Sequence, residues 1–341
     1  MIPHARPRFD DRFVRAVADV VRSGQVAEGG ICRQLETEVC TRLQRTDAVA
    51  VDSGTSALML ALRGLQQQGE VHMVGIPAYA CSSLWFAVRA AGCTPVLMDC
   101  AEDLRLHADK AWDVMPQLDA VIVVHPFGMV EPLIAESWTC PVIEDVAQAA
   151  GGMFQGRALG SFGDVAVASF YATKPWGGAY GGMVLGDVGL CDEVRRMSHP
   201  DVDDMACTYV GHHQLSNVHA ALALQRLQSA QYERTQRQQH MQWLDHLLPE
   251  TWRNGIWGRQ EGSACRYIVR MSEGADVWLE RLQQAGIAAA KPVQKPLCMP
   301  DAAMLEGAHS AWHDCVSLPV LVDMSMDEYE HYAQGVGACL S

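Results

Sequence analysis

Apolar residues recur along this chain in two alternating patterns, a helical spacing and short continuous runs. Segments 9–23 and 31–44 carry apolar residues at helical spacing, and Ser23-Gly24 ends the first of them. A short apolar run follows at 48–51, and a helix is expected to open at Ala57. The chain therefore begins with two helices, a strand and a third helix.

The alternation of strand and helix continues through the next hundred residues. The expected strands are short, rich in Val and Ile, and bounded by Gly or Asp, as is typical of strands covered on both faces. They fall at 72–76, 94–98, 118–124, 141–145, 165–168 and 181–185. The pattern predicts an α/β fold whose sheet is mostly parallel and flanked by helices.

The pattern changes after residue 187. A helix is expected at 190–197, an irregular segment at 207–217 and a long helix at 218–246. The remaining segments predict a smaller unit with strands at 265–271 and 316–320 and helices at 278–285, 301–311 and 325–340. The chain is therefore expected to form a large domain with an N-terminal arm, 1–235, and a small C-terminal α/β domain, 236–341.

Composition excludes some classes of protein. The 341 residues carry a formal net charge of −14, which disfavours general affinity for nucleic acid or anionic membranes. The 12 cysteines are scattered without a C-x-x-C or a zinc spacing, which favours free thiols in a reducing cytoplasm. No signal segment or apolar run of ~18 residues is present, so no membrane span is expected.

Three chemically active residues follow three of the expected strands. Asp145, Ser169 and Lys174 come at the carboxyl ends of such strands, where ligands bind in open α/β sheets. Each has an ordinary structural explanation alone, because many lysines are solvated and many strand-end Asp residues cap helices. Together they suit pyridoxal phosphate, which needs a lysine for its Schiff base, a carboxylate at its ring nitrogen and hydroxyls at its phosphate.

A possible anion site lies earlier, at residues 52–56. A strand, a glycine turn with hydroxyl groups and a helix N-terminus together offer free N–H groups to a negative ligand. Ser53 or Thr55 could also simply cap the helix. No Gly-Lys-Ser/Thr follows, and no G-x-G-x-x-G follows a strand, so Walker-type and dinucleotide-binding proteins are disfavoured.

These residues, in this order, resemble the DegT/DnrJ/EryC1/StrS sugar aminotransferase family, which has fold type I of the pyridoxal-phosphate enzymes. The resemblance covers nearly the whole chain and is most specific in its central blocks. Those blocks are Ile143-Glu144-Asp145-Val146-Ala147-Gln148-Ala149, then Gly160…Gly163-Asp164, Ser169-Phe170 with Lys174, and Gly181-Gly182. Ser53-Gly54-Thr55-Ser56 and His125-Pro126-Phe127-Gly128 also match.

The resemblance implies a role for each matching residue. Lys174 would form the Schiff base and move the proton, and Asp145 would pair with the ring nitrogen. Gln148 would contact the ring's 3-oxygen. The phosphate would be held by Gly54, Thr55, Ser56 and Ser169.

Two positions depart from the family pattern. Cys81 stands where the family often stacks an aromatic residue on the cofactor, and the nearest aromatic residues are Tyr79 and Trp85. The family also sends an Asn to the phosphate of the neighbouring subunit. Two alignments of the 211–217 segment place His212 or Gln214 at that position. The resemblance thus implies a homodimer with a shared active site.

The function implied is a pyridoxal-phosphate aminotransferase in the cytoplasm. The amino donor would be glutamate, and the acceptor a nucleotide-linked 3- or 4-keto sugar in amino-sugar or surface-polysaccharide biosynthesis. One alternative is a sugar dehydratase of the same family, although those relatives have histidine where this chain has Lys174. The other is a pyridoxal-phosphate-binding sensor or scaffold without turnover.

Overall fold

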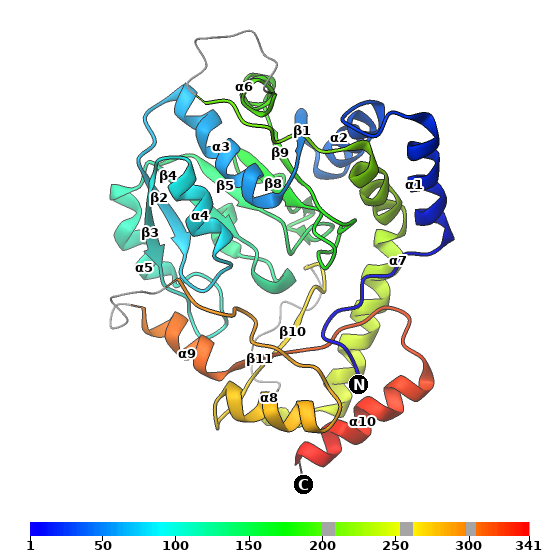
Figure 1. Ribbon diagram of the computed structural model, residues 1–341. Coiled ribbons are helices and arrows are strands. Elements are labelled where there is room, and N and C mark those ends of the chain that lie inside the picture. The colour runs from blue at the N-terminus through cyan, green and yellow to red at the C-terminus, as the bar shows by residue number, and fades with distance from the viewer. Residues whose placement is uncertain (200–208, 253–261, 298–304, 341) are drawn as a thin grey trace.

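A seven-stranded sheet forms the centre of the larger part of the molecule in the computed structural model, which describes residues 1–199, 209–252, 262–297 and 305–340 (Figure 1). Its strand order is β1-β9-β8-β5-β4-β2-β3. Strands β8, β5, β4, β2 and β3 are parallel, and β9 is antiparallel to both β1 and β8. The bounds are β1 Asp47–Val51, β2 Met73–Pro77, β3 Thr94–Met98, β4 Ala120–Val124, β5 Val142–Asp145, β8 Val165–Ser169 and β9 Gly182–Gly186. The prediction of a mostly parallel sheet is confirmed.

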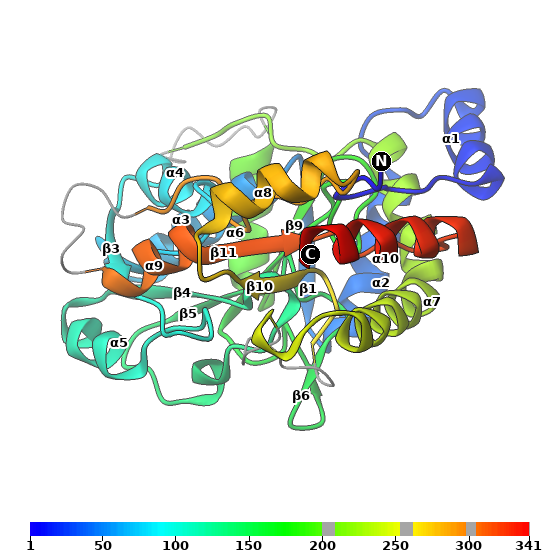
Figure 2. The same ribbon diagram turned by 90° about the horizontal axis from the view of Figure 1, so that it is seen from below.

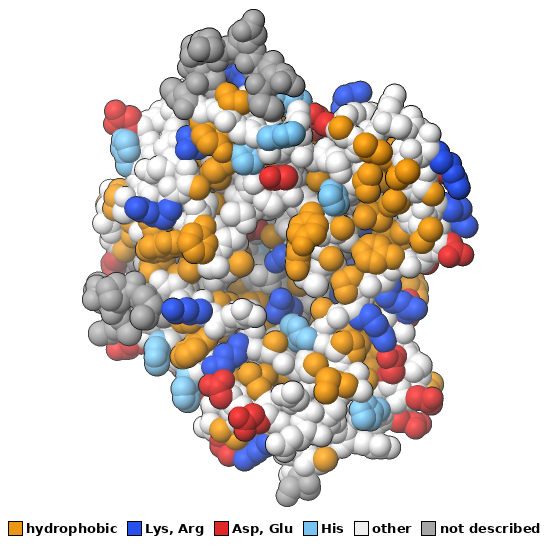
Figure 3. Space-filling model, in the orientation of Figure 1, with side chains coloured by type: hydrophobic (Ala, Val, Ile, Leu, Met, Phe, Trp, Pro, Cys, Tyr) orange, Lys and Arg blue, Asp and Glu red, His pale blue; other side chains and the backbone are white. Residues whose placement is uncertain are grey.

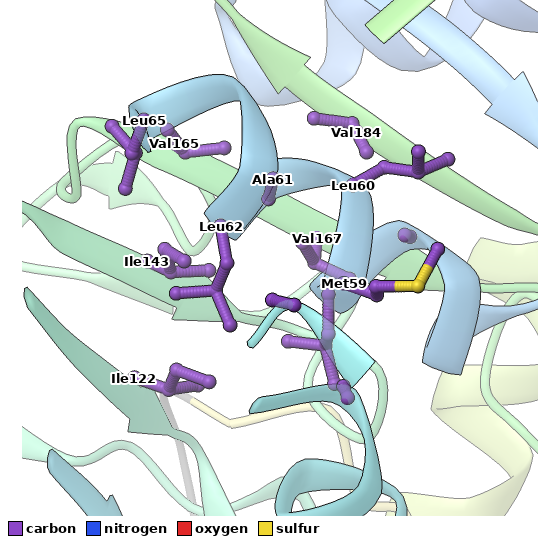
Figure 4. Close-up of a cluster of buried hydrophobic side chains, with 14 of the residues drawn as sticks. Met59, Leu60, Ala61, Leu62, Leu65, Ile122, Ile143, Val165, Val167 and Val184 are labelled. Atoms are coloured by element: carbon purple, nitrogen blue, oxygen red, sulfur yellow. The ribbon is translucent and has the colours of Figure 1, made fainter. Parts of the chain in front are cut away.

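Helices cover both faces of this sheet. Helices α3 (Gly54–Gln68), α4 (Ser83–Ala90) and α6 (Val188–Ser198) share a core with one face. Figure 4 shows Leu62 of α3 beside Ile122 and Ile143 of the sheet. The other face packs against α2 (Gly30–Leu43), α5 (Ala108–Val114) and the first part of α7 (Asn217–Leu247). Truncating a fully buried leucine such as Leu62 would cost about 2–5 kcal/mol.

Helix α7 connects this sheet to the C-terminal part of the chain (Figure 1). That part pairs β10 (Tyr267–Arg270) with β11 (Cys315–Leu318) in an antiparallel ribbon. Helices α8 (Ala275–Gln284), α9 (Glu306–Asp314) and α10 (Met326–Leu340) surround the ribbon (Figure 2). The expected helix at 301–311 begins later, at Glu306, and residues 301–304 lie outside the described residues. The domain boundary at residue 235 falls inside α7 and stays a prediction.

The N-terminal arm lies against the C-terminal part rather than along the sheet. Ile2 forms a β-bridge with Ile287, and its amide donates to the carbonyl of Gly286 at 2.7 Å. Arg6 forms an ion pair with Glu328 at 2.6 Å. Helix α1 (Asp11–Ser23) then packs on α7. The arm therefore holds the N-terminus of the chain against its C-terminal part.

Some elements are absent from the sequence prediction. The hairpin of β6 (Met153–Phe154) and β7 (Arg157–Ala158) turns through Gln155 and Gly156, both at positive φ. Helix α5 is also unpredicted, as are four short 3₁₀ helices at Met115–Gln117, Pro126–Gly128, Pro132–Ala135 and Glu250–Trp252. Within the described ranges, none of the helices has the length and apolar character needed to cross a membrane.

Candidate active site

Asp145 ends β5, in the middle of the sheet's carboxyl edge. It lies beside Val124 of β4 and Val167 of β8, and its side chain is buried. The amide of Ala147 donates to its carboxylate at 2.8 Å. Burial raises the pKa of Asp145, while the Ala147 hydrogen bond and the positive charge of Lys174 oppose the rise. The charged form of a buried carboxylate is stabilised strongly when a cationic group of a ligand lies beside it.

The preceding residue, Glu144, fixes the surroundings of this edge. Its carboxylate bonds to buried His125 at 3.0 Å and accepts the amides of Phe162 and Gly163 at 2.8 and 3.0 Å. Burial by itself would raise the pKa of Glu144, but the His125 and amide hydrogen bonds hold it below its usual range. Glu144 therefore holds the loops around Asp145 in place and does not face a ligand.

Lys174 follows β8 on a tightly folded turn. Its amide donates to the carbonyl of Tyr171 at 2.8 Å, and the amide of Gly177 donates to the carbonyl of Lys174 at 2.8 Å. A Cβ atom at Gly177 would lie 2.3 Å from the Tyr171 oxygen, so only glycine fits there. The side chain is half-buried, and the described residues offer its amine no hydrogen-bond partner. The turn thus presents a free amine close to Asp145.

The N-terminus of α3 lies beside the end of β8. Ser53 caps the helix by accepting the Ser56 amide at 3.1 Å, as the capping explanation predicted. Gly54 lies so near Ser169 that an added Cβ atom would be 3.1 Å from the serine Cβ. The next residue, Thr55, is exposed. The first amides of α3, which have no preceding carbonyl to bond, therefore lie next to a serine hydroxyl, an arrangement suited to a phosphate.

Gln148 contains an unsatisfied polar atom. Its side-chain oxygen is buried, and it has no hydrogen-bond partner among the described residues. Its backbone carbonyl accepts a 2.6 Å bond from Ser263 of the C-terminal part. The amide group can rotate so that either its oxygen or its NH2 group faces the ligand. The Gln148 side chain can therefore accept a hydrogen bond from a ligand or donate one to a ligand oxygen. Gln148 is three residues from Asp145, on the turn that follows β5.

The first position that departs from the family pattern is Cys81. Cys81 is exposed between β2 and α4. Tyr79 is buried, packs on Phe127 with a ring separation of 5.9 Å and bonds to the carbonyl of Ala311. Trp85 packs against the core under α4. The Tyr79 side chain is therefore not free to cover a ligand near Cys81, and Trp85 is partly buried against the core.

The 209–216 segment runs beside the start of α3. The amide of Asp52 donates to the carbonyl of His213 at 2.8 Å, and His213 bonds to Tyr209 at 2.7 Å. Gln214 bonds to His199 of the same chain, whereas His212 is exposed. Of the two predicted residues, His212 is the one whose side chain is available to another subunit.

A pocket of about 400 Å³ opens in front of Lys174, and we call it the Lys174 pocket. Its walls come from the arm, the Lys174 turn, α7 and the segments around β10 and β11. Figure 3 shows a hollow in this region, with basic side chains along it. The sequence prediction missed its arginine residues, since no motif connects chain segments so far apart. They are Arg6, Arg8, Arg12, Arg226, Arg237 and Arg266.

Comparison with known proteins identifies the architecture. The model of the DegT/DnrJ/EryC1/StrS aminotransferase family matches residues 7–336. A Streptomyces venezuelae protein named dTDP-3-amino-3,4,6-trideoxy-alpha-D-glucose transaminase is 34% identical over 193 residues, which is 53% of this chain. The matched stretch spans 50% of that relative's length.

Two solved structures share the fold along almost their whole length. The S. venezuelae protein DesV, solved in complex with a ketimine intermediate, superposes with a TM-score of 0.85, at 25% identity and 98% coverage of both chains. The PLP-form of a putative sugar aminotransferase, Spr1654 from Streptococcus pneumoniae, gives a TM-score of 0.83 at 20% identity and 99% coverage of both.

Proposed function

The chain belongs to the DegT/DnrJ/EryC1/StrS aminotransferase family, and we propose that it transfers an amino group from an amino acid to the keto group of a sugar. One observation supports this most strongly. The free amine of Lys174, the buried carboxylate of Asp145 and the N-terminus of α3 converge at one edge of the sheet, next to the Lys174 pocket. The predicted family is confirmed.

The cofactor prediction, pyridoxal phosphate, is confirmed at the level of the family, and the residues of this site fit it. Asp145 would face the ring nitrogen, and the unsatisfied Gln148 amide would face the ring oxygen. Gly54, Thr55, Ser56 and Ser169 would hold the phosphate. When bound, this cofactor supplies an electron sink that stabilises negative charge on the substrate carbon.

Lys174 would carry the proton transfer. The Lys174 side chain lines the pocket. There its amine can take the proton from the α-carbon of the donor and deliver it to the reacting carbon of the bound cofactor. The glycines at 177 and 178 keep the turn folded, because the Gly178 amide donates to the carbonyl of Phe170 at 3.0 Å.

The substrates follow from the relatives and stay proposals. The curated relative is named for a dTDP-linked amino sugar, which supports a nucleotide-linked 3- or 4-keto sugar as the acceptor here. We propose glutamate as the donor and amino-sugar or surface-polysaccharide biosynthesis as the setting. The presence of Lys174 disfavours the dehydratase alternative. A binding protein without turnover is the remaining alternative.

We propose a homodimer in the cytoplasm. Large apolar side chains are exposed on and near α1, on the turns beside Lys174 and on α7, which agrees with a covered surface in solution (Figure 3). They are Phe9, Val14, Val21, Tyr171, Tyr180 and Tyr232. Exposed His212 would reach the partner's phosphate. Light scattering on the purified protein should give twice the 37.3 kDa chain mass, and a monomer at micromolar concentration would exclude the shared site.

Turnover tests the proposed reaction. The protein loaded with pyridoxal phosphate is mixed with glutamate and a panel of nucleotide-linked 3-keto and 4-keto sugars, and amino sugar is detected by mass spectrometry. We expect amination of at least one sugar, together with release of 2-oxoglutarate, and neither product from Lys174→Ala. Cofactor binding without an amino sugar from any member of the panel would favour the non-catalytic alternative.

A further inference from the structure

Six arginine residues line the Lys174 pocket, and five of them form ion pairs with carboxylates. A guanidinium that is paired with a carboxylate has part of its hydrogen-bonding capacity already used, and the carboxylate offsets its charge. The ion pairs are Arg6–Glu328 at 2.6 Å, Arg8–Asp323 at 3.1 Å, Arg12–Asp10 at 2.6 Å, Arg237–Glu233 at 3.0 Å and the buried Arg226–Glu233 pair.

Arg266 is the exception. Across the described residues, its guanidinium has neither a carboxylate partner nor a side-chain hydrogen bond, although the side chain is partly buried. Its positive charge acts on His4. Burial, helped by the Arg266 charge, lowers the pKa of His4 to about 4, so this imidazole is neutral near pH 7. His4 instead bonds to Ser317 at 3.0 Å and leaves the Arg266 charge uncompensated.

The backbone places Arg266 close to the reacting groups. Its amide donates to the carbonyl of Phe127 at 3.1 Å, and the amide of Ser263 donates to that of Gly128 at 2.9 Å. These residues follow β4, the strand next to Asp145. Ser263 also bonds to Gln148. The start of β10 is therefore fixed against the predicted cofactor site, with Arg266 in the same pocket as Lys174.

We propose that Arg266 binds a carboxylate of the amino-acid donor, an inference that rests on the proposed function. A planar guanidinium matches one carboxylate through two parallel hydrogen bonds. A diphosphate carries at least two charges and would need further free cations. Apart from Lys174 itself, every other cationic side chain in the described part of the pocket lies against a carboxylate, with Arg226 and Arg237 sharing Glu233. A donor held at Arg266 would have its α-carbon near the Lys174 amine.

Binding of a substrate mimic tests this assignment. Glutarate has the two carboxylates of glutamate but no amino group, so it binds without reacting. Its affinity for the pyridoxal-phosphate-loaded protein is measured by calorimetry in wild type, Arg266→Leu and Arg266→Lys. We expect Arg266→Leu to lose affinity about 10- to 100-fold, since a charge-assisted hydrogen bond is removed, and Arg266→Lys to lose less.

Two controls define the result. Arg22→Leu removes the same charge from an exposed site on α1 and should bind glutarate within twofold of wild type. Arg266→Gln removes the charge but keeps a polar hydrogen-bonding side chain, in case the leucine variant does not fold. Unchanged thermal unfolding and cofactor absorbance would show that each variant is intact. Glutarate affinity equal to wild type in both Arg266→Leu and Arg266→Gln would overturn the proposal.

A second ligand distinguishes the two possible anions. Binding of dTDP or UDP, which represent a nucleotide-linked acceptor, should be unchanged in Arg266→Leu. Loss of nucleotide affinity with glutarate binding intact would assign Arg266 to the acceptor phosphate and overturn the donor assignment. Because neither ligand reacts, these measurements stand even if no sugar is aminated. Failure of the proposed function is thereby separated from failure of the Arg266 site.

Discussion

The carboxyl edge of the sheet and the Lys174 pocket meet at Lys174, but they are built differently. At the sheet edge, polar groups are held mainly by backbone amides close in sequence, such as Ala147 at Asp145 and Ser56 at Ser53. In the pocket, charged side chains from distant segments hold one another, as Arg6 and Glu328 do across 322 residues. The first region is preorganised by local backbone contacts, as the proposed cofactor site requires, whereas the second depends on the docking of the arm and the C-terminal part.

The largest effect should come from breaking the buried ion pair of the pocket region. Arg226 and Glu233 are 5% and 7% exposed, and Arg226 also donates to the carbonyls of Gly177 and Arg8. Glu233→Ala would leave a buried charge without its partner and lower the free energy of unfolding by about 3–5 kcal/mol.

Urea denaturation measures this change. The matched control is Glu38→Ala, which breaks an Arg–Glu pair on the surface of α2 and should cost about 0.5 kcal/mol or less. Equal losses in the two variants would mean that the Arg226–Glu233 pair does not hold the arm and the Lys174 turn together.

The next effect should be confined to the sheet edge. Asp145→Asn keeps the size of the side chain and an oxygen for the Ala147 amide, but it removes the negative charge. We expect kcat for amination to fall about 100- to 1,000-fold, the cost typical of losing one preorganised electrostatic group, with unfolding little changed. Steady-state kinetics and thermal unfolding measure the two quantities. A fall in stability with kcat intact would assign Asp145 a structural role alone.

Acid should weaken the pocket region before the sheet edge. The pKa of His4 is lowered from 6.5 to about 4, so the unfolded chain binds this proton more readily than the folded one. The stability contributed by neutral His4 is complete above about pH 6.5 and is lost as pH falls toward 4. Hydrogen exchange of residues 1–8 should therefore quicken between pH 7 and pH 5, relative to that of β5. His4→Gln should remove most of this dependence, and an unchanged dependence would contradict the assignment.

The smallest effect should come from the partly exposed end of the arm. The Arg6 hydrogen bond is the main reason that the pKa of Glu328 falls to about 2. The pair therefore stabilises the fold above the ordinary glutamate pKa, and this contribution is lost as pH falls toward 2. Because both side chains are about one-third exposed, Arg6→Ala should cost less than about 1 kcal/mol at pH 7. Thermal unfolding measures it, and a larger loss would indicate that Arg6 has additional contacts.

Sequence patterns predicted one region much better than the other. The strands that end at Asp145 and Ser169 are short apolar runs that stop at polar residues, so both their position and their polar ends were readable. The contacts of the arm could not be predicted, because no local sequence pattern pairs Ile2 with Ile287 or Arg6 with Glu328. The isolation of Arg266 depends on which arginines find carboxylates after folding, which is a property of the three-dimensional structure alone.

The central claim is that the sheet edge binds the cofactor while Arg266 in the pocket binds the donor. Cofactor binding and donor binding should therefore be lost independently in different variants. Absorbance titration with pyridoxal phosphate, followed by glutarate, in wild type, Lys174→Ala and Arg266→Leu tests it most directly. We predict that Lys174→Ala loses the visible band that depends on this amine, whereas Arg266→Leu keeps the band and loses its response to glutarate. A visible band that is the same with and without Lys174, or an Arg266→Leu protein that responds to glutarate as wild type does, would contradict the account.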